Sequence, residues 1–539
     1  MSKAMTDTSI STAPSAKEVH ISQQPRHLGW LIAACALLPL LALISPINHD
    51  ETQYIAAAQL ASEGLIPFRD FLYLQTPYQI YLFAPIFGLF EQYGFIASRI
   101  ATGLLGAGVL LLSYAALRAF RVEPGRAAIC CLLLTLCHTF VFSVTVVRND
   151  ALPALLLSGA ILVIAMQLVE RGQGQSGGQL WAWALAGALL GGAAGTKISY
   201  LAPALCLAGF PIWASLLQAM PWRSAIARCA AVTPGLALAL APLLWFREGA
   251  AFAFDYGNFG YHAEAPLAWY AANGLEDRLT LLAKARDVFL TLIRGPALFA
   301  LVIYVWLRLA CVRRREAQRP FLLLIDVLVF AGLVATIAPT PTWRQYAMPL
   351  LPPLFIGLGL VWQEHGERGG GVSSLAKYAF ILASIAGLGQ PLFQVWKSTM
   401  GDEANPLTIQ AEGAFLASEA AALGLDGPVA SLSPEVVLAS GLPLDPTFAT
   451  GPFAYRTGDM IAVEDRDALH IATHGSVGDY LARTQPDAIV TGYENFDHVD
   501  ALGLEVPIEE YARGAGYRRL ESPHGDAIIW LSAAVDEAQ

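Results

Sequence analysis

Long apolar runs with almost no charge recur along the chain, and they limit what it can fold into. A helix of about 20 apolar residues is needed to cross the ~30 Å hydrocarbon core of a bilayer. Runs near that length lie at 28–46, 96–117, 127–147, 150–169, 180–196, 198–218, 226–246, 295–312, 321–338, 345–363 and 374–396. We therefore predict a polytopic α-helical membrane protein with about eleven transmembrane helices.

The overall composition agrees with a membrane protein. Charged residues make up 14% of the 539 residues and the mean hydropathy is +0.50, whereas soluble domains carry about 25% charge. This excludes disordered, collagen-like and disulfide-scaffold proteins. The seven cysteines all lie in apolar segments and show no metal-binding spacing. One more apolar run, Tyr78–Phe90, has only thirteen residues, so we expect a short interfacial or re-entrant helix there.

Charge divides the chain into two regions. Residues 400–539 carry 23 Asp and Glu and only 6 Lys and Arg, whereas the first 399 residues carry 20 Asp and Glu and 27 Lys and Arg. We predict a disordered tail at 1–27, a transmembrane domain at 28–397 and an α/β domain at 398–539. Its expected strands are 428–432, 487–491 and 527–531, and its expected helices are 433–441 and 475–484. Because so acidic a domain repels phosphate backbones, we expect no nucleic acid partner.

The distribution of basic residues predicts the orientation. Lys and Arg favour the cytoplasmic side of a membrane. With a cytoplasmic N-terminus, eleven spans place thirteen Lys and Arg in inner connections, including the cluster at 313–315. A full span at 78–90 would move that cluster outside. We therefore expect a plasma-membrane protein with its N-terminus in the cytoplasm and its C-terminal domain on the outer face.

The first outer connection begins with two acidic residues. Asp50 and Glu51 directly follow the first apolar run. Asn48 or Asp50 is a candidate cap for a helix over 52–63, because side-chain oxygens and carboxylates favour helix N-termini. Alternatively, Asp50 is a general base at the membrane surface, aimed at an acceptor hydroxyl.

Two further turns on the same side carry charges. Charged side chains this close to hydrocarbon are costly unless they are paired. Arg148 and Asp150 lie in a short turn between two spans, where they either form a structural pair or line a polar site. Lys197 lies in another such turn. It either extends its amine to the interface or contacts a phosphate.

The later outer connections add aromatic and basic residues. Aromatic side chains in connection 247–294 either anchor the chain at the interface or stack on sugar rings, and His262 among them is either structural or a ligand of metal or phosphate. Arg344 precedes a span, where its charge opposes the helix dipole and favours a nearby anion. Several cations and a carboxylate pair at one depth suit a phosphate-bearing lipid.

Six segments occur in an order that matches a known superfamily. They are HDETQYIAAAQLASEG, TPYQIYLFAPIF, FIASRIATGLLG, VVRNDALPALLL, GAAGTKISYLAPAL and RQYAMPLLPPL. In this order they resemble the GT-C membrane glycosyltransferases, namely the dolichyl-phosphate-mannose protein mannosyltransferase superfamily and its bacterial branch with the lipid A aminoarabinose transferase. The resemblance covers residues 28–365 and, more loosely, the α/β tail.

The resemblance implies a set of site residues. It implies a catalytic acidic pair, Asp50 and Glu51, with Asp50 as the base. It also implies a donor-phosphate site at Lys197 and Arg344, although Ile198 stands where the family has glycine. Arg148 is a further phosphate candidate. The candidates for substrate binding are Tyr54, Asp150, His262 and Tyr346.

One departure bears on metal use. The aminoarabinose branch has Glu-Lys-Pro before the short apolar run, whereas this chain has Gln75-Thr76-Pro77. The carboxylate that the branch offers a metal is therefore replaced, which disfavours zinc at His262 and aminoarabinose as the sugar. We expect no required cofactor; a divalent metal is compatible with the sequence but not indicated by it.

The resulting hypothesis is an inverting glycosyltransferase. By resemblance, its donor is a polyprenyl-monophosphate sugar, and its acceptor is a hydroxyl on a cell-envelope lipid, glycan or protein. A lipid-linked glycan flippase is one alternative, although it predicts midplane polar residues and internal repeats. A glycan polymerase or ligase that uses diphosphate-linked donors is another. A catalytically silent subunit, suggested by Gln75 and Thr76, is a third.

Overall fold

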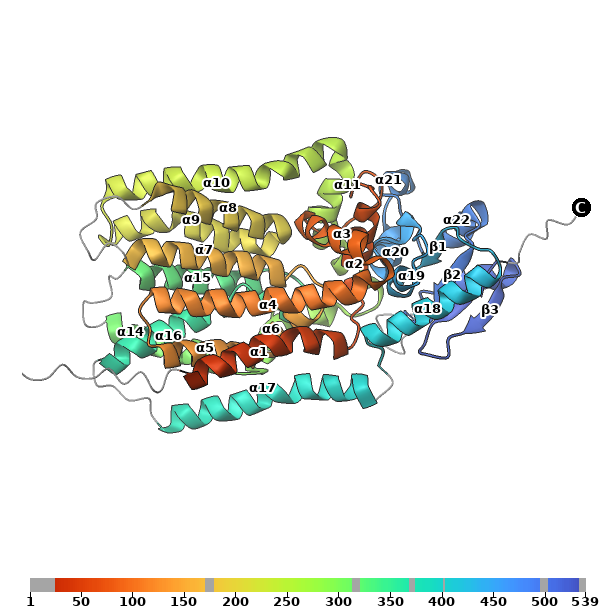
Figure 1. Ribbon diagram of the computed structural model, residues 1–539. Helices are drawn as coiled ribbons and strands as arrows, with labels where there is room; N and C mark the ends of the chain where they lie inside the picture. The colour runs from red at the N-terminus through yellow and green to blue at the C-terminus, as the bar shows by residue number, and fades with distance from the viewer. Residues whose placement is uncertain are drawn as a thin grey trace, which may run out of the picture.

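A bundle of long helices and a smaller region containing a β-sheet lie end to end in the computed structural model (Figure 1). The structure describes residues 25–169, 179–312, 320–367, 374–400, 403–494 and 503–532. Most of the expected tail 1–27 lies outside these residues. Helix α1 begins at the end of the bundle remote from the sheet, and α17 ends at the end nearer the sheet. The chain therefore enters and leaves the bundle at opposite ends.

The bundle is built from helices at the positions of the apolar runs. They are α1 (Pro25–Ile44), α4 (Gly94–Ala119), α5 (Pro124–Thr135), α6 (His138–Thr145), α7 (Ala151–Val169), α8 (Leu180–Thr196), α9 (Leu201–Leu216), α10 (Trp222–Gly249), α14 (Ala297–Val312), α15 (Pro320–Ile337), α16 (Leu351–Glu367) and α17 (Ser374–Met400). Their outward faces expose large apolar side chains such as Leu238, Leu244 and Ile381. A soluble protein would not expose so many, so the helices are those of a polytopic membrane protein.

The number of helices able to cross a bilayer differs from the eleven expected. Among the described residues, seven helical stretches are long and apolar enough, and two bent pairs raise the number to nine. The run 127–147 is one of these pairs, because its helix breaks between α5 and α6 with a bend of 73°. The other pair joins α13 (Leu281–Ile293) to α14 with a bend of 91°. Helices α8 and α16, with 17 residues each, fall short of the length required.

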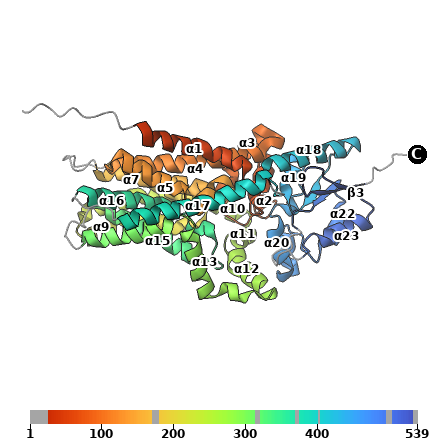
Figure 2. The ribbon, with the colours of Figure 1, turned by 90° about the horizontal axis from the view of Figure 1, so that it is seen from below.

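Short helices cover the end of the bundle that faces the sheet. They are α2 (Glu51–Ser62), α3 (Tyr78–Phe90), α11 (Ala251–Asp255), α12 (Tyr261–Ala272) and α13. Helix α3 is the short element expected from the sequence, and Glu91, with φ of 48°, ends it before α4 begins. Figure 2 shows α12 and α13 projecting on one side of the molecule, with α12 next to α20 (Pro452–Thr457).

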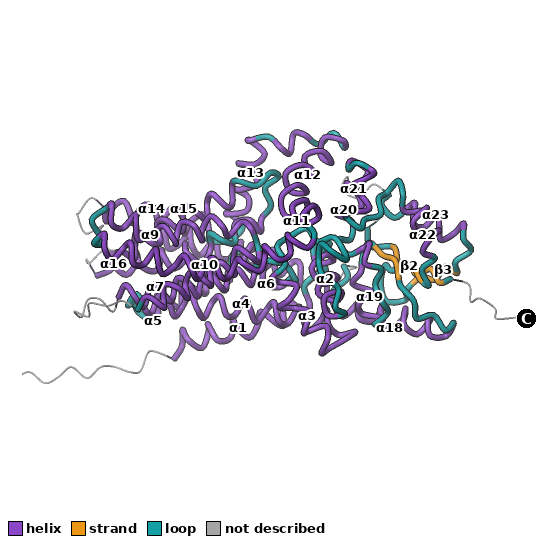
Figure 3. The backbone as a smooth tube through the Cα atoms, turned by 90° about the horizontal axis from the view of Figure 1, so that it is seen from above, coloured by secondary structure: helices purple, strands orange, loops and turns teal. Residues whose placement is uncertain are grey.

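The C-terminal region folds around a four-stranded sheet in the order β1-β2-β4-β3 (Figure 3). Strands β1 (Val429–Ser431) and β2 (Ala488–Thr491) are parallel, and β4 (Ile528–Leu531) runs antiparallel to β2 and β3 (Arg518–Glu521). The three expected strands are β1, β2 and β4. The accompanying helices are α18 (Pro406–Ala422), α19 (Pro434–Ser440), α20, α21 (Val463–Ala468), α22 (Val477–Thr484) and α23 (Val506–Gly514).

One continuous apolar core joins this region to the end of the bundle. It contains Ile55 of α2 and Phe83 of α3 together with Val436 of α19 and Ile529 of β4. Burial of such side chains contributes roughly 1.5–3 kcal/mol each. The shared core therefore holds the loops at the bundle's end against the α/β region.

Candidate active site

A cavity of about 280 Å³ lies between the end of the bundle and the α/β region. Its walls come from six separate parts of the chain: the α1–α2 connection with the start of α2, the segment before α3, α6 with the turn after it, α12, the segment after α15, and α20. Six residues predicted from the sequence line it: Asp50, Tyr54, Arg148, His262, Arg344 and Tyr346. The predicted Glu51, Asp150 and Lys197 do not line the cavity and are buried behind its wall.

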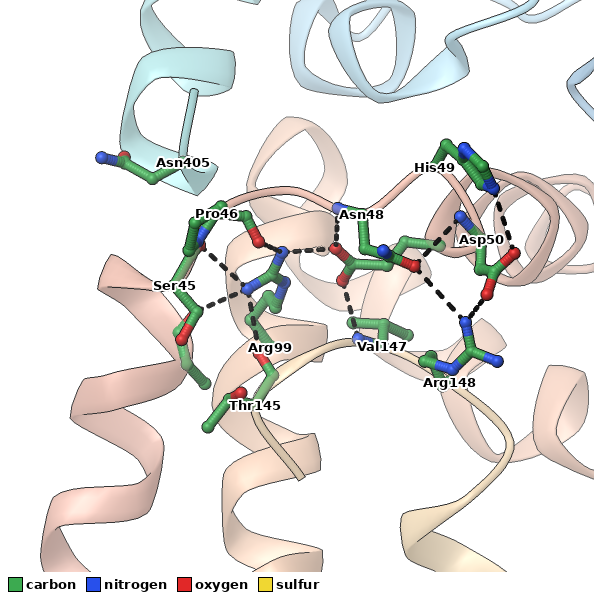
Figure 4. Close-up of polar contacts among 12 residues, drawn as sticks. Ser45, Pro46, Asn48, His49, Asp50, Arg99, Thr145, Val147, Arg148 and Asn405 are labelled. Atoms are coloured by element: carbon green, nitrogen blue, oxygen red, sulfur yellow. Dashed lines mark hydrogen bonds and ion pairs between the residues drawn. The ribbon is translucent and has the colours of Figure 1, made fainter. Parts of the chain in front are cut away.

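Asp50 presents its carboxylate to the cavity. The carboxylate forms an ion pair with Arg148 and lies 3.4 Å from His49 Nε2 (Figure 4). Asp50 occupies the N-cap position of α2 but makes no side-chain cap hydrogen bond. Instead, Asn48 Oδ1 accepts hydrogen bonds from the Asp50 amide and from Arg148. The carboxylate is therefore committed to the cavity and not to the helix end.

Glu51 points the opposite way, into the protein. Its carboxylate pairs with Arg99 and accepts hydrogen bonds from the amides of Val147 (2.7 Å) and Asn48 (3.0 Å). Arg99 also donates to the carbonyl oxygens of Ala42, Ser45, Pro46 and Thr145. Figure 4 shows Arg99 below the loop that carries Asp50, with its bonds to Ser45, Pro46 and Thr145. The adjacent acids thus have different surroundings, and Glu51 fixes the loop that presents Asp50.

The second acid, Asp150, links two of the predicted cations. Lys197 Nζ lies 2.5 Å from Asp150 Oδ1, and Arg148 Nε lies 3.2 Å from Asp150 Oδ2. All three side chains are at most 6% exposed. Lys197 also lies 5.4 Å from the ring centre of Tyr346, which faces the cavity. Lys197 therefore supports the cavity wall through Asp150 and Tyr346.

Arg344 is a cation of a different kind. Its guanidinium carbon lies 3.7 Å from the ring centre of Phe142, and its nearest polar side-chain partner is His138 Nε2 at 3.4 Å. Within the described ranges it makes no ion pair. Burial, helped by the charges of Arg148 and Arg294, lowers the pKa of Arg344 to about 10, so it stays positive at neutral pH. An uncompensated cation at a cavity wall favours an anionic ligand.

A hydrogen-bonded chain of neutral side chains forms another wall. Tyr54 donates to Asn149 Oδ1 at 3.1 Å, and Asn149 donates to Gln75 Oε1 at 3.1 Å. His262 Nε2 lies 2.7 Å from the Leu74 carbonyl oxygen, and burial lowers the pKa of His262. In the part of the chain that the structure describes, no three His, Cys, Asp or Glu side chains are grouped to hold a metal ion.

Sequence reasoning did not single out Arg99, Phe142 or Arg456, which all contribute to this site. Arg99 had a signal, since an arginine inside an apolar run needs buried partners. Phe142 had none, because one aromatic residue in an apolar run is ordinary. Arg456 lies in a region without recognised motifs and reaches the cavity only through the tertiary fold.

Comparison with known proteins gives likeness of fold. No protein-family model and no curated protein sequence matches the chain. The structure is similar to that of ArnT from Cupriavidus metallidurans bound to undecaprenyl phosphate, at 14% identity and a TM-score of 0.59, covering 94% of this chain and 98% of that one.

It is also similar to the Archaeoglobus fulgidus oligosaccharyltransferase tethered to an acceptor peptide. That match has 12% identity and a TM-score of 0.51, and it covers 95% of this chain and 74% of the other. Both similarities extend over nearly the whole chain, so they include the bundle and the α/β region together. The chain therefore has the fold of the GT-C membrane glycosyltransferases.

Proposed function

We propose that the protein is an inverting glycosyltransferase that moves a sugar from a polyprenyl-monophosphate donor to an acceptor hydroxyl. The observation that carries this proposal is that one cavity is lined both by the Asp50 carboxylate and by the Arg344 guanidinium, which makes no ion pair among the described residues. Undecaprenyl phosphate, the ligand named for the similar ArnT structure, belongs to the donor class proposed here.

The net charge of the site supports an anionic donor. Arg148, Lys197 and Arg344 contribute three positive charges, while Asp50 and Asp150 contribute two negative charges. Glu51 and Arg99 neutralise one another. These groups together leave one positive charge, which a phosphate would balance, and Arg456 adds a further cation on another wall of the cavity. Arg344, with Arg148 beside it, is the proposed phosphate contact, and Lys197 acts through Asp150.

In the proposed reaction, the acceptor oxygen attacks the anomeric carbon as the bond from that carbon to the phosphate oxygen breaks. The phosphate leaves with the electron pair of the broken bond, and Asp50 takes the proton of the acceptor hydroxyl. The ion pair with Arg148 favours the ionised form of Asp50, which is the form that accepts a proton. Arg344 stabilises the charge that grows on the leaving phosphate. No metal is needed where side-chain cations supply this charge.

The most direct test is the fate of the donor. Purified protein in lipid nanodiscs is incubated with short-chain polyprenyl-phosphate sugars that differ in the sugar, with host membrane lipids and glycans as acceptors. The proposal predicts release of polyprenyl phosphate together with a new glycoside. A flippase would leave the donor intact, and a diphosphate-dependent polymerase would ignore it. Either result contradicts the proposal.

For localisation, we propose the plasma membrane, with the N-terminus in the cytoplasm and the α/β region outside. The start of helix α1 and the α/β region lie at opposite ends of the bundle, in agreement with this orientation (Figure 1). Reporter fusions in the α9–α10 connection and after α23 should report opposite compartments. The same compartment for both would contradict the orientation.

A further inference from the structure

Helix α20 brings a cation from the α/β region to the cavity. Phe453, Arg456 and Thr457 of this helix line the cavity together with residues of the bundle. The approach is close: a Cβ atom on Gly451, at the start of α20, would lie 2.7 Å from Thr52 Oγ1 of α2, and Gly451 has φ of +55°. The start of α20 therefore packs tightly against Thr52, the residue that follows the acidic pair Asp50 and Glu51.

Aromatic rings hold Arg456 in place. Its guanidinium carbon lies 4.9 Å from the ring centre of Trp269 and 5.2 Å from that of Phe453. Both rings line the cavity, and so does Tyr261. Burial raises the pKa of the Tyr261 hydroxyl, and the charge of Arg456 beside it opposes that rise. Arg456 is half-buried, and its Nε atom is buried without a hydrogen-bond partner among the described residues.

No carboxylate compensates this charge at close range. Among the residues that the structure describes, Arg456 makes no ion pair within 4.0 Å, whereas Arg466 pairs with Asp459 and Arg247 pairs with Asp255. Glu494 interacts with Arg456 electrostatically. However, burial and the neighbouring acids Glu435 and Glu505 raise the pKa of Glu494 well above its ordinary value. The ionised form of Glu494 is thus disfavoured, which weakens its compensation of the Arg456 charge.

Counted over the described residues, the cavity therefore has two guanidinium groups without an ion pair on different walls. Arg344 belongs to the segment between α15 and α16 in the bundle, where the phosphate of a membrane-held lipid would lie. Arg456 belongs to the α/β region, beyond the end of the bundle (Figure 2). A single donor phosphate uses the first of these and leaves the second without a ligand.

We infer that Arg456 binds an anionic group, a phosphate or a carboxylate, on the acceptor, and so selects an acidic lipid or glycan. This inference rests on the proposed function, because it assigns the second substrate of the same cavity. Trp269 and Phe453 would stack against the acceptor beside that group. Arg456 is an acceptor-binding residue in this account and takes no part in bond breaking.

The test uses the labelled donor that releases most polyprenyl phosphate in the assay above. Host membrane lipids and glycans are separated by anion exchange into neutral, carboxylate-bearing and phosphate-bearing fractions, and each is offered to the full chain in nanodiscs. We expect label in one of the two anionic fractions, and the fraction identifies the group. Arg456→Gln should raise the acceptor KM about ten- to a hundredfold, while donor KM and donor hydrolysis by water stay unchanged.

Two controls make the result specific. Arg518→Gln removes an exposed arginine of β3 that is not among the residues lining the cavity, and should match wild type. Arg456→Lys keeps the charge and should recover part of the acceptor affinity. Label in the neutral fraction, or an unchanged acceptor KM in Arg456→Gln, overturns the inference but leaves the glycosyltransferase proposal intact. Failure of wild type to use any donor overturns both.

Discussion

Glu51 and Arg99 form an ion pair in which both side chains are 0% exposed. Arg99 also donates hydrogen bonds to four backbone carbonyl oxygens at the end of α1, in the α1–α2 connection and at the end of α6. The α1–α2 connection carries Asp50, and the turn after α6 carries Arg148. The pair therefore acts as the internal support of the loop that carries Asp50, and its partners lie far apart in the sequence.

We predict that breaking this pair destabilises the protein. Glu51→Gln or Arg99→Met leaves a buried charge without its partner, which costs on the order of 3–5 kcal/mol. Thermal unfolding of the purified protein measures this, with Asp70→Asn as the control, since the exposed Arg69–Asp70 pair contributes at most about 1 kcal/mol. The double variant Glu51→Gln/Arg99→Met should lose less stability than the sum of the losses measured for the two single variants, because it leaves no unpaired charge. A change as small as the control's would show that the pair does not support the loop.

Arg344→Gln should weaken both donor binding and turnover. Loss of a charge-assisted hydrogen bond to phosphate costs about 1.5–3 kcal/mol, or about ten- to over a hundredfold in kcat/KM. Donor titration at a fixed acceptor concentration measures the effect. Arg247→Gln, which removes an exposed arginine paired with Asp255, is the matched control. Unchanged kinetics in Arg344→Gln would remove Arg344 from the phosphate site.

Lys197 offers a test between two roles. If Lys197 acts through Asp150, as their 2.5 Å contact indicates, then Lys197→Met leaves a buried carboxylate short of a partner. Asp150→Asn in the same protein should then restore part of the lost activity, with a coupling of about 0.5–3 kcal/mol. Measured kcat/KM for the two single variants and the double variant gives this coupling. Strictly additive losses would favour direct phosphate binding by Lys197, the role predicted from the sequence.

The raised pKa of Glu435 should make the free energy of unfolding decrease as the pH rises. Glu435 is buried in α19 beside the Glu51–Arg99 pair, and burial, with the charges of Glu51 and Glu412 adding and that of Arg99 opposing, raises its pKa from 4.5 to about 8. Between these values the folded protein holds a proton that the unfolded chain has lost. Its contribution to stability is therefore complete below about pH 4.5 and is lost as the pH rises towards 8, at about 1.4 kcal/mol per pH unit.

The variant Glu435→Gln isolates this effect. It keeps the shape of the protonated acid and cannot ionise, so its unfolding midpoint should fall less than that of wild type between pH 5 and 8. Denaturant unfolding of both proteins across this range provides the comparison. Parallel curves would show that Glu435 does not titrate in this window.

The sequence predicts the positions of the bundle helices well because membrane spans need long uncharged runs. It does not predict the break between α5 and α6, since the residues on both sides are equally apolar. Strand β3 also escapes prediction, because its side chains are mostly exposed and polar and lack a buried pattern. The bend between α13 and α14 is likewise a tertiary feature, whereas the count falls from eleven to at most nine among the described residues because α8 and α16 are too short.

The candidate site shows the same division. Order and residue type identify Asp50, Arg148 and Arg344 as members of one site, and the fold brings them to one cavity. Neighbouring residues can nevertheless have opposite surroundings, and no pattern separates the half-buried, cavity-lining Asp50 from the fully buried Glu51. Arg456 becomes visible only when the α/β region is placed against α2 and α12.

The measurement that tests the account most directly is glycosyl transfer by purified Asp50→Asn. The substitution keeps the size of the side chain, while removing the proton acceptor and the ion pair with Arg148. A general base contributes about 10²–10⁴-fold, so kcat should fall by that factor at saturating donor and acceptor, with thermal stability close to wild type. Turnover near the wild-type level in folded Asp50→Asn protein would contradict the central claim that Asp50 takes the proton of the acceptor.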